Sequence, residues 1–308
     1  MSELLGVSVS KHQIIMSHTP MQRLAMEHRD HLVLVVGNEL TPLIAQAYGF
    51  KHAVGPSQFL RREPSIWPHT YMNGALAGKV ELCPMPSEDK TEAHPFYHSK
   101  LTDVRAIFVF HDGLDWGTEL QMVCDALRGE TGRVLGAAAL NTYPRPRDSK
   151  PPPQTPIFFT NPDFVWKNEQ SFPRFGQGAF RMSVEVLYKR LTGHHLHYTE
   201  IGKPTALTYS FAQQRLQELA DQLALEPAAT DATMLQQPST LDRIYMIGDN
   251  PASDIRGANR AKGKWVSVLV ETGVFMRHDE HHNDPDDPAH HIFRDVSRAV
   301  DHILTEHV

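Results

Sequence analysis

The most constraining feature of the sequence is the run 243–259, in which a short apolar segment ends in two spaced aspartates. Residues 244–247 have the pattern of a buried β-strand, and Gly248-Asp249 ends it. The residues after Asp254 have the small size and polarity of a helix start. In open α/β sheets, ligands bind in the loops that follow the carboxyl ends of the strands. The run therefore predicts an α/β fold with two carboxylates at a ligand-binding edge.

These two carboxylates have two interpretations. Hard oxygen ligands suit Mg²⁺, which takes one or two carboxylates together with water and phosphate oxygens. Alternatively, Asp and Gly are the ordinary residues of turns, and Asp254 is a suitable helix N-cap. An isolated Gly-Asp would favour the turn. The full run is more specific, and it favours a magnesium site formed by Asp249 and Asp254.

The segment from Gly248-Asp249 to Asp254 resembles the fourth motif of the haloacid dehalogenase (HAD) superfamily, Gly-Asp-x4-Asp. Its continuation through residue 259, and then residues 265–275, is similar to subfamily IIA and, within it, to the eukaryotic group related to cat eye syndrome critical region protein 5. The resemblance implies an α/β fold: a Rossmann-like parallel-sheet core at 1–21 and 197–308, with an inserted α/β (C2-type) cap domain at 22–196. The implied activity is Mg²⁺-dependent hydrolysis of a small phosphorylated metabolite, with the cap closing over it.

A second segment, Ile201-Gly-Lys203-Pro-Thr, resembles the third motif of the superfamily. An unassisted lysine is usually solvated surface, but the spacing before Gly248-Asp249 favours a functional role. The resemblance makes Lys203 a clamp that neutralises a phosphoryl oxygen or an attacking carboxylate. It makes Asp249 a direct or water-bridged Mg²⁺ ligand. It makes Asp254 a residue that orients the ligands around the Mg²⁺ ion. Ser253 is placed with the substrate-binding loop.

Three residues of the implied cap are candidates for substrate binding. Asn161 and Asp163 lie in Thr-Asn-Pro-Asp, which is similar to a cap segment that meets the substrate in subfamily IIA. Their alternative is an Asx-turn. Arg174 precedes two glycines and a helix, and a guanidinium can bind a phosphate or carboxylate with two hydrogen bonds. The alternative for Arg174 is a solvated surface arginine.

The nucleophile motif of the superfamily, Asp-x-Asp-Gly, occurs nowhere in the 308 residues. In HAD hydrolases the first of its aspartates attacks phosphorus and the second protonates the leaving group. The segment His111-Asp112-Gly-Leu-Asp115 imitates the motif, but its aspartates are three residues apart, so Asp115 is interpreted as a turn or N-cap residue. We expect a truncated version of a longer hydrolase that is inactive as it stands. The alternative is a non-catalytic binding or scaffold protein on a HAD fold.

Hydrophobic periodicity predicts the remaining elements. Strands are expected near 13–17, 32–37, 106–110, 157–160, 264–270 and 292–293. Helices are expected near 23–28, 42–48, 118–127, 179–192, 207–225 and 296–306. Residues 51–100 lack periodicity and predict irregular structure, 144–156 is proline-rich and linker-like, and 226–240 is typical of a loop. The His- and Asp-rich segment 278–291 favours a solvated loop over a transition-metal site.

Bulk composition excludes several classes of protein. Hydrophobic residues make up 41% of the chain and charged residues 21%, which is typical of a folded globular protein. The net charge of −6 argues against a nucleic-acid surface, and no apolar run reaches the length of a transmembrane segment. Two cysteines are too few for a disulfide framework. The expected partner is a small phosphorylated substrate, and a homo-oligomer is left open.

The resemblance implies a mitochondrial location, with the cytoplasm as the alternative. Some family members carry names tied to glycerophospholipid metabolism, but no residue of this sequence identifies a lipid substrate.

Overall fold

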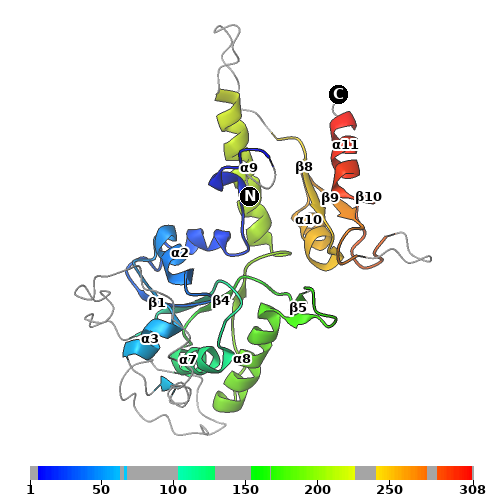
Figure 1. Ribbon diagram of the computed structural model, residues 1–308. Coiled ribbons are helices and arrows are strands. Elements are labelled where there is room, and N and C mark those ends of the chain that lie inside the picture. The colour runs from blue at the N-terminus through cyan, green and yellow to red at the C-terminus, as the bar shows by residue number, and fades with distance from the viewer. Residues whose placement is uncertain are drawn as a thin grey trace. The chain divides into compact units, whose positions relative to one another are not determined.

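The computed structural model describes residues 6–62, 66–67, 103–128, 154–166, 168–225, 241–275 and 283–306. The chain divides into two compact units, which Figure 1 shows as ribbons. The terminal unit comprises Met1–Pro20 and Gly202–Val308, and the central unit comprises Met21–Ile201. The sequence placed residues 197–201 with the terminal unit. They belong to the central unit because the strand Thr199–Glu200 pairs with the central sheet.

The central unit is built on a parallel sheet with the strand order β2-β1-β3-β4-β7. All four strand pairs in this sheet are parallel. Its strands β1 and β3 are continuous apolar runs that are buried along their whole length, as expected of a parallel sheet covered on both faces. The strands are β1 (Leu32–Val36), β2 (His52–Val54), β3 (Ala106–Val109), β4 (Ile157–Phe159) and β7 (Thr199–Glu200).

Alternate residues of the central strands face two different layers, because side chains on a strand alternate between faces. Ile107 and Val109 join the cluster that includes residues of α3 (Pro56–Arg62), α7 (Trp116–Arg128) and α8 (Gln177–Thr192). Between them, Phe108 faces the opposite layer, where its ring centroid lies 4.8 Å from those of both Phe50 and Phe158. The helix α2 (Thr41–Tyr48) precedes Phe50 in the chain.

The terminal unit contains a parallel sheet of β8 (Ile244–Gly248), β9 (Trp265–Val270) and β10 (His291–Phe293), in the order β10-β9-β8. One face packs on residues of α9 (Ala206–Leu225) and α10 (Arg256–Ala261), in a cluster with Ile244 and Trp265. The other face packs on α11 (Val296–Glu306), where Ala299 contacts the cluster of Val268 and Val270. This layering confirms the predicted α/β fold.

Two predictions near the amino terminus are wrong. Residues 14–17 form no strand; a short 3₁₀ helix, Lys11–Gln13, stands before them. The helix expected over 23–28 is a 3₁₀ segment, Thr19–Leu24, followed by turns. A short apolar run becomes a strand only when a neighbour accepts its backbone hydrogen bonds, and no described strand pairs with residues 14–17.

The segment 51–100 was expected to be irregular, yet its first part contains β2 and α3. The predictions for 226–240 and for most of 144–156 lie outside the described residues. Elsewhere the helix predictions hold to within a few residues, and α11 has the predicted bounds. No helix in the described ranges is both long and apolar enough to cross a membrane.

A buried carboxyl group organises the loop after β3. Glu119 on α7 is 3% exposed. Its Oε1 accepts hydrogen bonds from the backbone amides of Leu114, at 3.0 Å, and Asp115, at 3.4 Å. Burial is the largest effect on this group, and it raises the pKa of Glu119 from 4.5 to about 7. Glu119 is therefore an acid that the fold keeps largely protonated below neutral pH.

We predict that this group makes the stability of the protein fall as pH rises. Between about pH 4.5 and about pH 7 the unfolded chain releases the Glu119 proton while the folded chain retains it. The free energy of unfolding should therefore fall by roughly 3 kcal/mol across that interval. Glu119→Gln should remove most of this pH dependence, as measured by urea unfolding at several pH values. The matched control is Glu39→Gln, at an exposed position of the same unit, which should leave the wild-type pH profile unchanged.

Candidate functional site

The strand β8 delivers two aspartates to its carboxyl end, and a lysine from far away in the sequence joins one of them. Asp254 is 3% exposed, and its Oδ1 accepts a hydrogen bond from Lys203 Nζ at 2.5 Å. The Lys203 side chain is 48% exposed. The ammonium group therefore neutralises a buried carboxylate on one side and faces solvent on the other. The structure thus brings together the two residues that the sequence assigned to different motifs.

The loop that carries Asp254 is shaped around its carboxylate. Residues Pro251–Ile255 form a single π-helical turn, whose N-cap residue Asn250 accepts a hydrogen bond from the Ala252 amide at 3.1 Å. The second carboxylate oxygen, Oδ2, accepts from the Asn250 amide at 3.2 Å. A Cβ atom at Gly248 would lie 2.4 Å from Asp254 Cγ and Oδ2. Glycine ends the strand because any side chain there would collide with this carboxylate.

A buried tyrosine supports the same turn from α9. The Tyr209 hydroxyl donates a hydrogen bond to the carbonyl oxygen of Asp254 at 2.8 Å. Burial, with the nearby charge of Asp254, raises the pKa of Tyr209, so the phenol keeps its proton and stays a donor. A Cβ atom at Gly257 would lie 2.2 Å from the Tyr209 ring. Sequence analysis missed Tyr209, because nothing local marks a helix tyrosine as the support of a loop 45 residues away.

The other aspartate, Asp249, is tied to the loop after the neighbouring strand β9. Its Oδ2 accepts a hydrogen bond from the Val274 amide at 2.7 Å, and its carbonyl oxygen accepts from the Phe275 amide at 3.0 Å. A Cβ atom at Gly273 would lie 1.9 Å from Asp249 Oδ2. Asp249 is partly exposed, whereas Asp254 is buried. The arrangement gives the two acids different environments, and their roles at a metal site stay predictions.

Comparison with known proteins identifies the family. A family model described as HAD-hydrolase-like matches residues 200–299, which contain Lys203, Asp249 and Asp254. A mitochondrial hydrolase of Saccharomyces cerevisiae is 35% identical over 285 residues, covering 91% of this chain and 74% of that protein. The chain belongs to the family of this relative, a family of HAD-like hydrolases.

A second relative of this HAD chain is a fusion protein of Schizosaccharomyces pombe, named as a cardiolipin synthase (CMP-forming) joined to a mitochondrial hydrolase. It is 31% identical over 309 residues, which cover 100% of this chain and 45% of the fusion protein. The chain therefore spans less than half the length of this relative.

Solved structures share the HAD fold at low sequence identity. A hypothetical protein from Pyrococcus horikoshii has a TM-score of 0.57 and 17% identity, covering 98% of this chain and 79% of that one. A 4-nitrophenylphosphatase from Thermotoga maritima has a TM-score of 0.54 and 14% identity, covering 97% of this chain and 76% of that one. These similarities confirm the expected fold, a Rossmann-like HAD core with an α/β cap.

Ser253, assigned to the substrate-binding loop of the HAD core, is buried in the π-helical turn. It is 6% exposed, and its carbonyl oxygen lies 3.4 Å from the Tyr209 hydroxyl. Its amide donates to the Asn250 carbonyl oxygen at 3.3 Å. These contacts are structural, and a contact between Ser253 and substrate remains a prediction.

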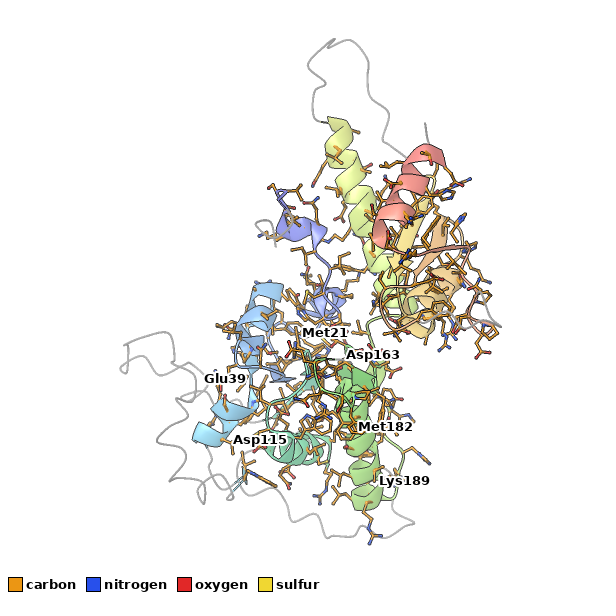
Figure 2. All side chains as sticks on the ribbon, turned by 45° about the vertical axis from the view of Figure 1, so that its right-hand side comes forward. Met21, Glu39, Asp115, Asp163, Met182 and Lys189 are labelled. Carbon is orange, nitrogen blue, oxygen red and sulfur yellow. The ribbon has the colours of Figure 1, made fainter. Side chains whose placement is uncertain are left out.

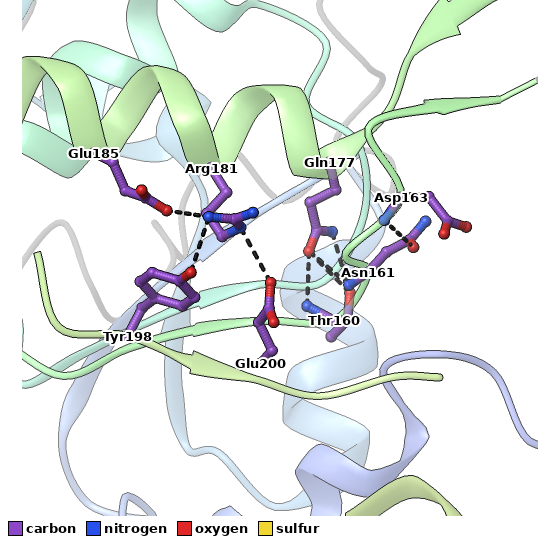
Figure 3. Close-up of polar contacts among 8 residues, drawn as sticks. All are labelled: Thr160, Asn161, Asp163, Gln177, Arg181, Glu185, Tyr198 and Glu200. Carbon is purple, nitrogen blue, oxygen red and sulfur yellow. Dashed lines mark hydrogen bonds and ion pairs between the residues drawn. The ribbon is translucent and has the colours of Figure 1, made fainter. Parts of the chain in front are cut away.

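The cap candidates lie in the central unit, at the ends of its strands. The Asn161 side chain accepts a hydrogen bond from the Asp163 amide at 3.0 Å, which is the Asx-turn that the sequence left as an alternative (Figure 3). Arg174 is exposed on the short hairpin of β5 (Val165–Trp166) and β6 (Arg174–Phe175). Substrate binding by Asn161, Asp163 and Arg174 remains a prediction.

The two glycines at the start of α8, Gly176 and Gly178, have a packing role. A Cβ atom at Gly176 would lie 2.6 Å from the Asp163 carbonyl oxygen, and one at Gly178 would lie 2.3 Å from that of Pro162. The backbone of the Asx-turn therefore runs directly against the start of α8, and only glycine allows this approach. Along the rest of α8, Met182 is 47% exposed and Lys189 is also exposed (Figure 2).

A buried glutamine that sequence analysis missed holds this edge of the cap. Gln177 is 1% exposed, and its Oε1 accepts from the amides of Thr160, at 2.7 Å, and Asn161, at 2.9 Å (Figure 3). Its Nε2 donates to the Thr160 hydroxyl at 3.1 Å. Nearby, burial raises the pKa of Asp112, and the Asp112 Oδ1 has no hydrogen-bond partner among the described residues.

A single arginine of α8, Arg181, connects the helix to the edge strand β7. Arg181 Nη1 donates to the Tyr198 hydroxyl at 2.9 Å and contacts Glu185, while Arg181 Nε lies 3.1 Å from Glu200 Oε1 (Figure 3). Salt bridges and hydrogen bonds from one guanidinium thus join the last strand of the central sheet to the helix that covers it.

Asp115, which imitates a nucleophile aspartate, is confirmed as an N-cap residue. It accepts hydrogen bonds from the Thr118 amide, at 3.3 Å, and the Thr118 hydroxyl, at 2.6 Å, at the start of α7. Both of its carboxylate oxygens are therefore engaged in starting the helix.

The interpretation of 278–291 as a solvated loop holds only in part for its described residues, because several of them are exposed but Asp287 and Ala289 are buried. Asp287 is 8% exposed and is bound by Arg256, whose Nε lies 2.9 Å from Asp287 Oδ1 and whose Nη2 lies 2.6 Å from Oδ2. Asn259 Nδ2 donates to the Pro288 carbonyl oxygen at 2.8 Å. The loop is therefore packed against α10, directly after the aspartate motif. Composition alone suggested solvation because the partner cation lies 31 residues away.

We predict that Gly248→Ala displaces the Asp254 carboxylate. The backbone at Gly248 is compatible with alanine, so the cost comes from the collision with Asp254 and should be about 2 kcal/mol or more of the free energy of unfolding. The matched control is Gly263→Ala in the same unit, where φ is +67° and no atom lies within 4 Å of the added Cβ. The control should cost roughly 1–2 kcal/mol through backbone conformation alone.

Urea unfolding measures the stability of both variants, and titration with Mg²⁺ separates their effects on the site. Gly248→Ala should weaken Mg²⁺ binding, and Gly263→Ala should not. Equal stability losses with unchanged Mg²⁺ binding in both variants would show that Gly248 does not shape the position of Asp254.

Proposed function

We propose that Lys203, Asp249 and Asp254 supply the electrostatic and metal-binding half of a Mg²⁺-dependent HAD phosphatase site for a small phosphorylated metabolite. The observation that carries the proposal is the hydrogen bond between Lys203 and the buried carboxylate of Asp254, 51 residues apart in sequence, at the end of β8. The buried carboxylate needs this cation for stability, and the same contact holds the half-exposed ammonium at the edge where the family motifs meet. In the HAD family, a lysine and an aspartate in these two motifs serve phosphoryl transfer, and we propose the same role for Lys203 and Asp254.

The donor set at this edge fits magnesium. Asp249 and Asp254 offer hard carboxylate oxygens, which Mg²⁺ prefers. Both Asp254 oxygens already accept hydrogen bonds, from Lys203 and from the Asn250 amide. Asp249 is more exposed than Asp254, and the Val274 amide binds its Oδ2 rather than its Oδ1. Asp249 is therefore the residue proposed to hold the metal ion, and Asp254 the residue that orients the group around it.

Each side chain has a distinct task in this proposal. Magnesium, when bound, would offset the negative charge of the phosphoryl group and of the attacking carboxylate. The exposed side of the Lys203 ammonium binds a phosphoryl oxygen, and its charge stabilises the negative charge that builds up during transfer. Asp254 fixes the direction of Lys203. Tyr209 holds the turn in place, and the glycines at 248 and 257 leave room for it. The turn therefore needs little rearrangement when a phosphoryl group binds.

The names of the relatives support a cellular setting. Both curated relatives are named mitochondrial hydrolases, and we place this chain in the mitochondrion on that basis. One of them is joined to a cardiolipin synthase, which supports a phosphorylated substrate connected with glycerophospholipid metabolism. We keep Asn161, Asp163 and Arg174 of the cap as the proposed substrate contacts.

The 308 residues contain no Asp-x-Asp-Gly. We propose that hydrolysis needs a carboxylate nucleophile from outside them, and that these residues alone bind metal and phosphate without turnover. The same observation favours a second candidate, a non-catalytic binding protein on the HAD fold. Joining a strand that ends in Asp-x-Asp-Gly to the amino terminus distinguishes the two, since only a hydrolase gains Mg²⁺-dependent activity.

We predict that the 308-residue protein binds Mg²⁺ through Asp249 and releases no 4-nitrophenol from 4-nitrophenyl phosphate above the uncatalysed rate. Isothermal titration calorimetry should show Mg²⁺ affinity reduced at least about 10-fold in Asp249→Asn, because the residue supplies a ligand oxygen. Asp242→Asn is the matched control, an exposed aspartate shortly before β8, and should bind Mg²⁺ like the wild type.

Two results would contradict this proposal in different ways. Mg²⁺ binding that is unchanged in Asp249→Asn would remove the metal site from the end of β8. Mg²⁺-dependent turnover that disappears in Asp249→Asn would keep the metal site but show that a nucleophile exists within the 308 residues.

A further inference from the structure

A cluster of two histidines and a glutamate lies apart from the residues discussed so far. His291 belongs to β10, and His302 and Glu306 belong to α11. One ligand atom from each side chain can be chosen so that all three lie within 4.8 Å of one another. The strand and the helix are neighbours at the outer edge of the terminal sheet (Figure 1).

The spacing of the two helix residues of the cluster matches that of two ligands of one metal ion. His302 and Glu306 are four residues apart on a helix, so their side chains share a face. His302 Nε2 lies 3.3 Å from Glu306 Oε1. Two ligand atoms that each lie about 2.1 Å from a tetrahedral Zn²⁺ are about 3.4 Å from each other. This pair already has that separation, and a shift of at most about 1.4 Å would bring His291, whose ligand atom lies within 4.8 Å of both, to the same distance.

The Nε2 atom of His302 has an ion-pair contact with Glu306 Oε1 but forms no hydrogen bond with it. This atom is buried and makes no hydrogen bond within the part of the chain that the structure describes. Buried polar atoms are nearly always satisfied, and an exception needs a physical reason such as a bound ion. The Phe293 ring, with its centroid 5.0 Å from that of His302 and 6.4 Å from that of His291, packs beside both imidazoles and limits their movement.

Tyr245 of β8 and Arg243, which precedes the strand, hold Glu306 in an orientation suited to binding. Its Oε2 lies 3.4 Å from the Tyr245 hydroxyl, which donates to it, and 3.7 Å from Arg243 Nη1. These contacts direct Oε1 toward His302. Hydrogen bonds from a second layer of residues to a ligand carboxylate are a regular feature of metal sites.

We propose that His291, His302 and Glu306 bind Zn²⁺, with water in the fourth position. Two imidazoles and one carboxylate favour a transition metal, whereas Mg²⁺ prefers oxygen ligands alone. This site is therefore chemically distinct from the pair Asp249 and Asp254. The ion would link the end of α11 to the edge strand β10, two elements that meet otherwise mainly through apolar contacts.

Two simpler arrangements compete with this proposal. His302 and Glu306 are also an ordinary (i, i+4) ion pair on a helix. The His-rich sequence at 278–282 could bind zinc by composition alone. An ion pair without a metal predicts no zinc binding at all. Binding by the His-rich sequence predicts a zinc affinity that does not depend on α11.

The test is a zinc titration of the 308-residue protein at about pH 7.5, since a metal ion binds the neutral form of histidine. Competition with a chromogenic chelator gives the affinity. We expect each of His291→Ala, His302→Ala and Glu306→Gln to weaken binding at least about 10-fold. His12→Ala, an exposed histidine of the same unit, and the double variant His281→Ala/His282→Ala are the controls, and both should retain wild-type affinity.

Co²⁺ substitution provides a readout that does not depend on affinity. A tetrahedral site should give the wild-type protein a visible absorption spectrum that Glu306→Gln alters, while its far-ultraviolet circular dichroism stays the same. The proposal is overturned if the wild type binds no zinc, or if affinity is lost in His281→Ala/His282→Ala and kept in the three cluster variants.

Discussion

The terminal unit depends on the burial of one negative charge. Asp254 is 3% exposed, and a carboxylate in such a place is tolerated only when a cation and hydrogen-bond donors satisfy it. Lys203 and the Asn250 amide meet that demand. The demand also accounts for the glycine at 248, because the strand must pass within reach of the carboxylate. The protein's own donors hold this charge in place, and charges held in this way are what electrostatic catalysis requires.

Both units place their polar side chains by the same rule. Parallel strands present buried apolar residues along their length and polar groups where they end, so Asp249 follows β8 and Asn161 follows β4. In the terminal unit the end of the strand holds two carboxylates and a lysine. In the central unit Gln177 and Thr160 saturate the equivalent edge with internal hydrogen bonds. The same architecture therefore yields a lysine–carboxylate pair at the edge of one unit and a network of neutral hydrogen bonds at the end of β4 in the other.

What the sequence could predict was determined by local pattern. The bounds of α11 follow from periodicity, and the link between Lys203 and Asp254 was accessible because each residue sits in a recognisable motif. Tyr209, Gln177 and Glu119 carried no local signal, because their partners are set by packing. The strand expected at 13–17 failed for the same reason, since an apolar run specifies a strand only where a neighbouring strand exists to pair with it.

The segment 283–291 shows that composition can suggest metal binding without locating the ligands. Its aspartates and prolines suggest solvation, yet Arg256 and Asn259 bind it to α10, and β10 begins at its end. This docking fixes the backbone of His291 beside the helix that carries His302. A histidine-rich sequence by itself offers ligands without geometry, and the loss of conformational freedom needed to collect them opposes binding. The fold already brings His291, His302 and Glu306 together. These three residues therefore form a better proposed zinc site than the neighbouring histidine-rich sequence.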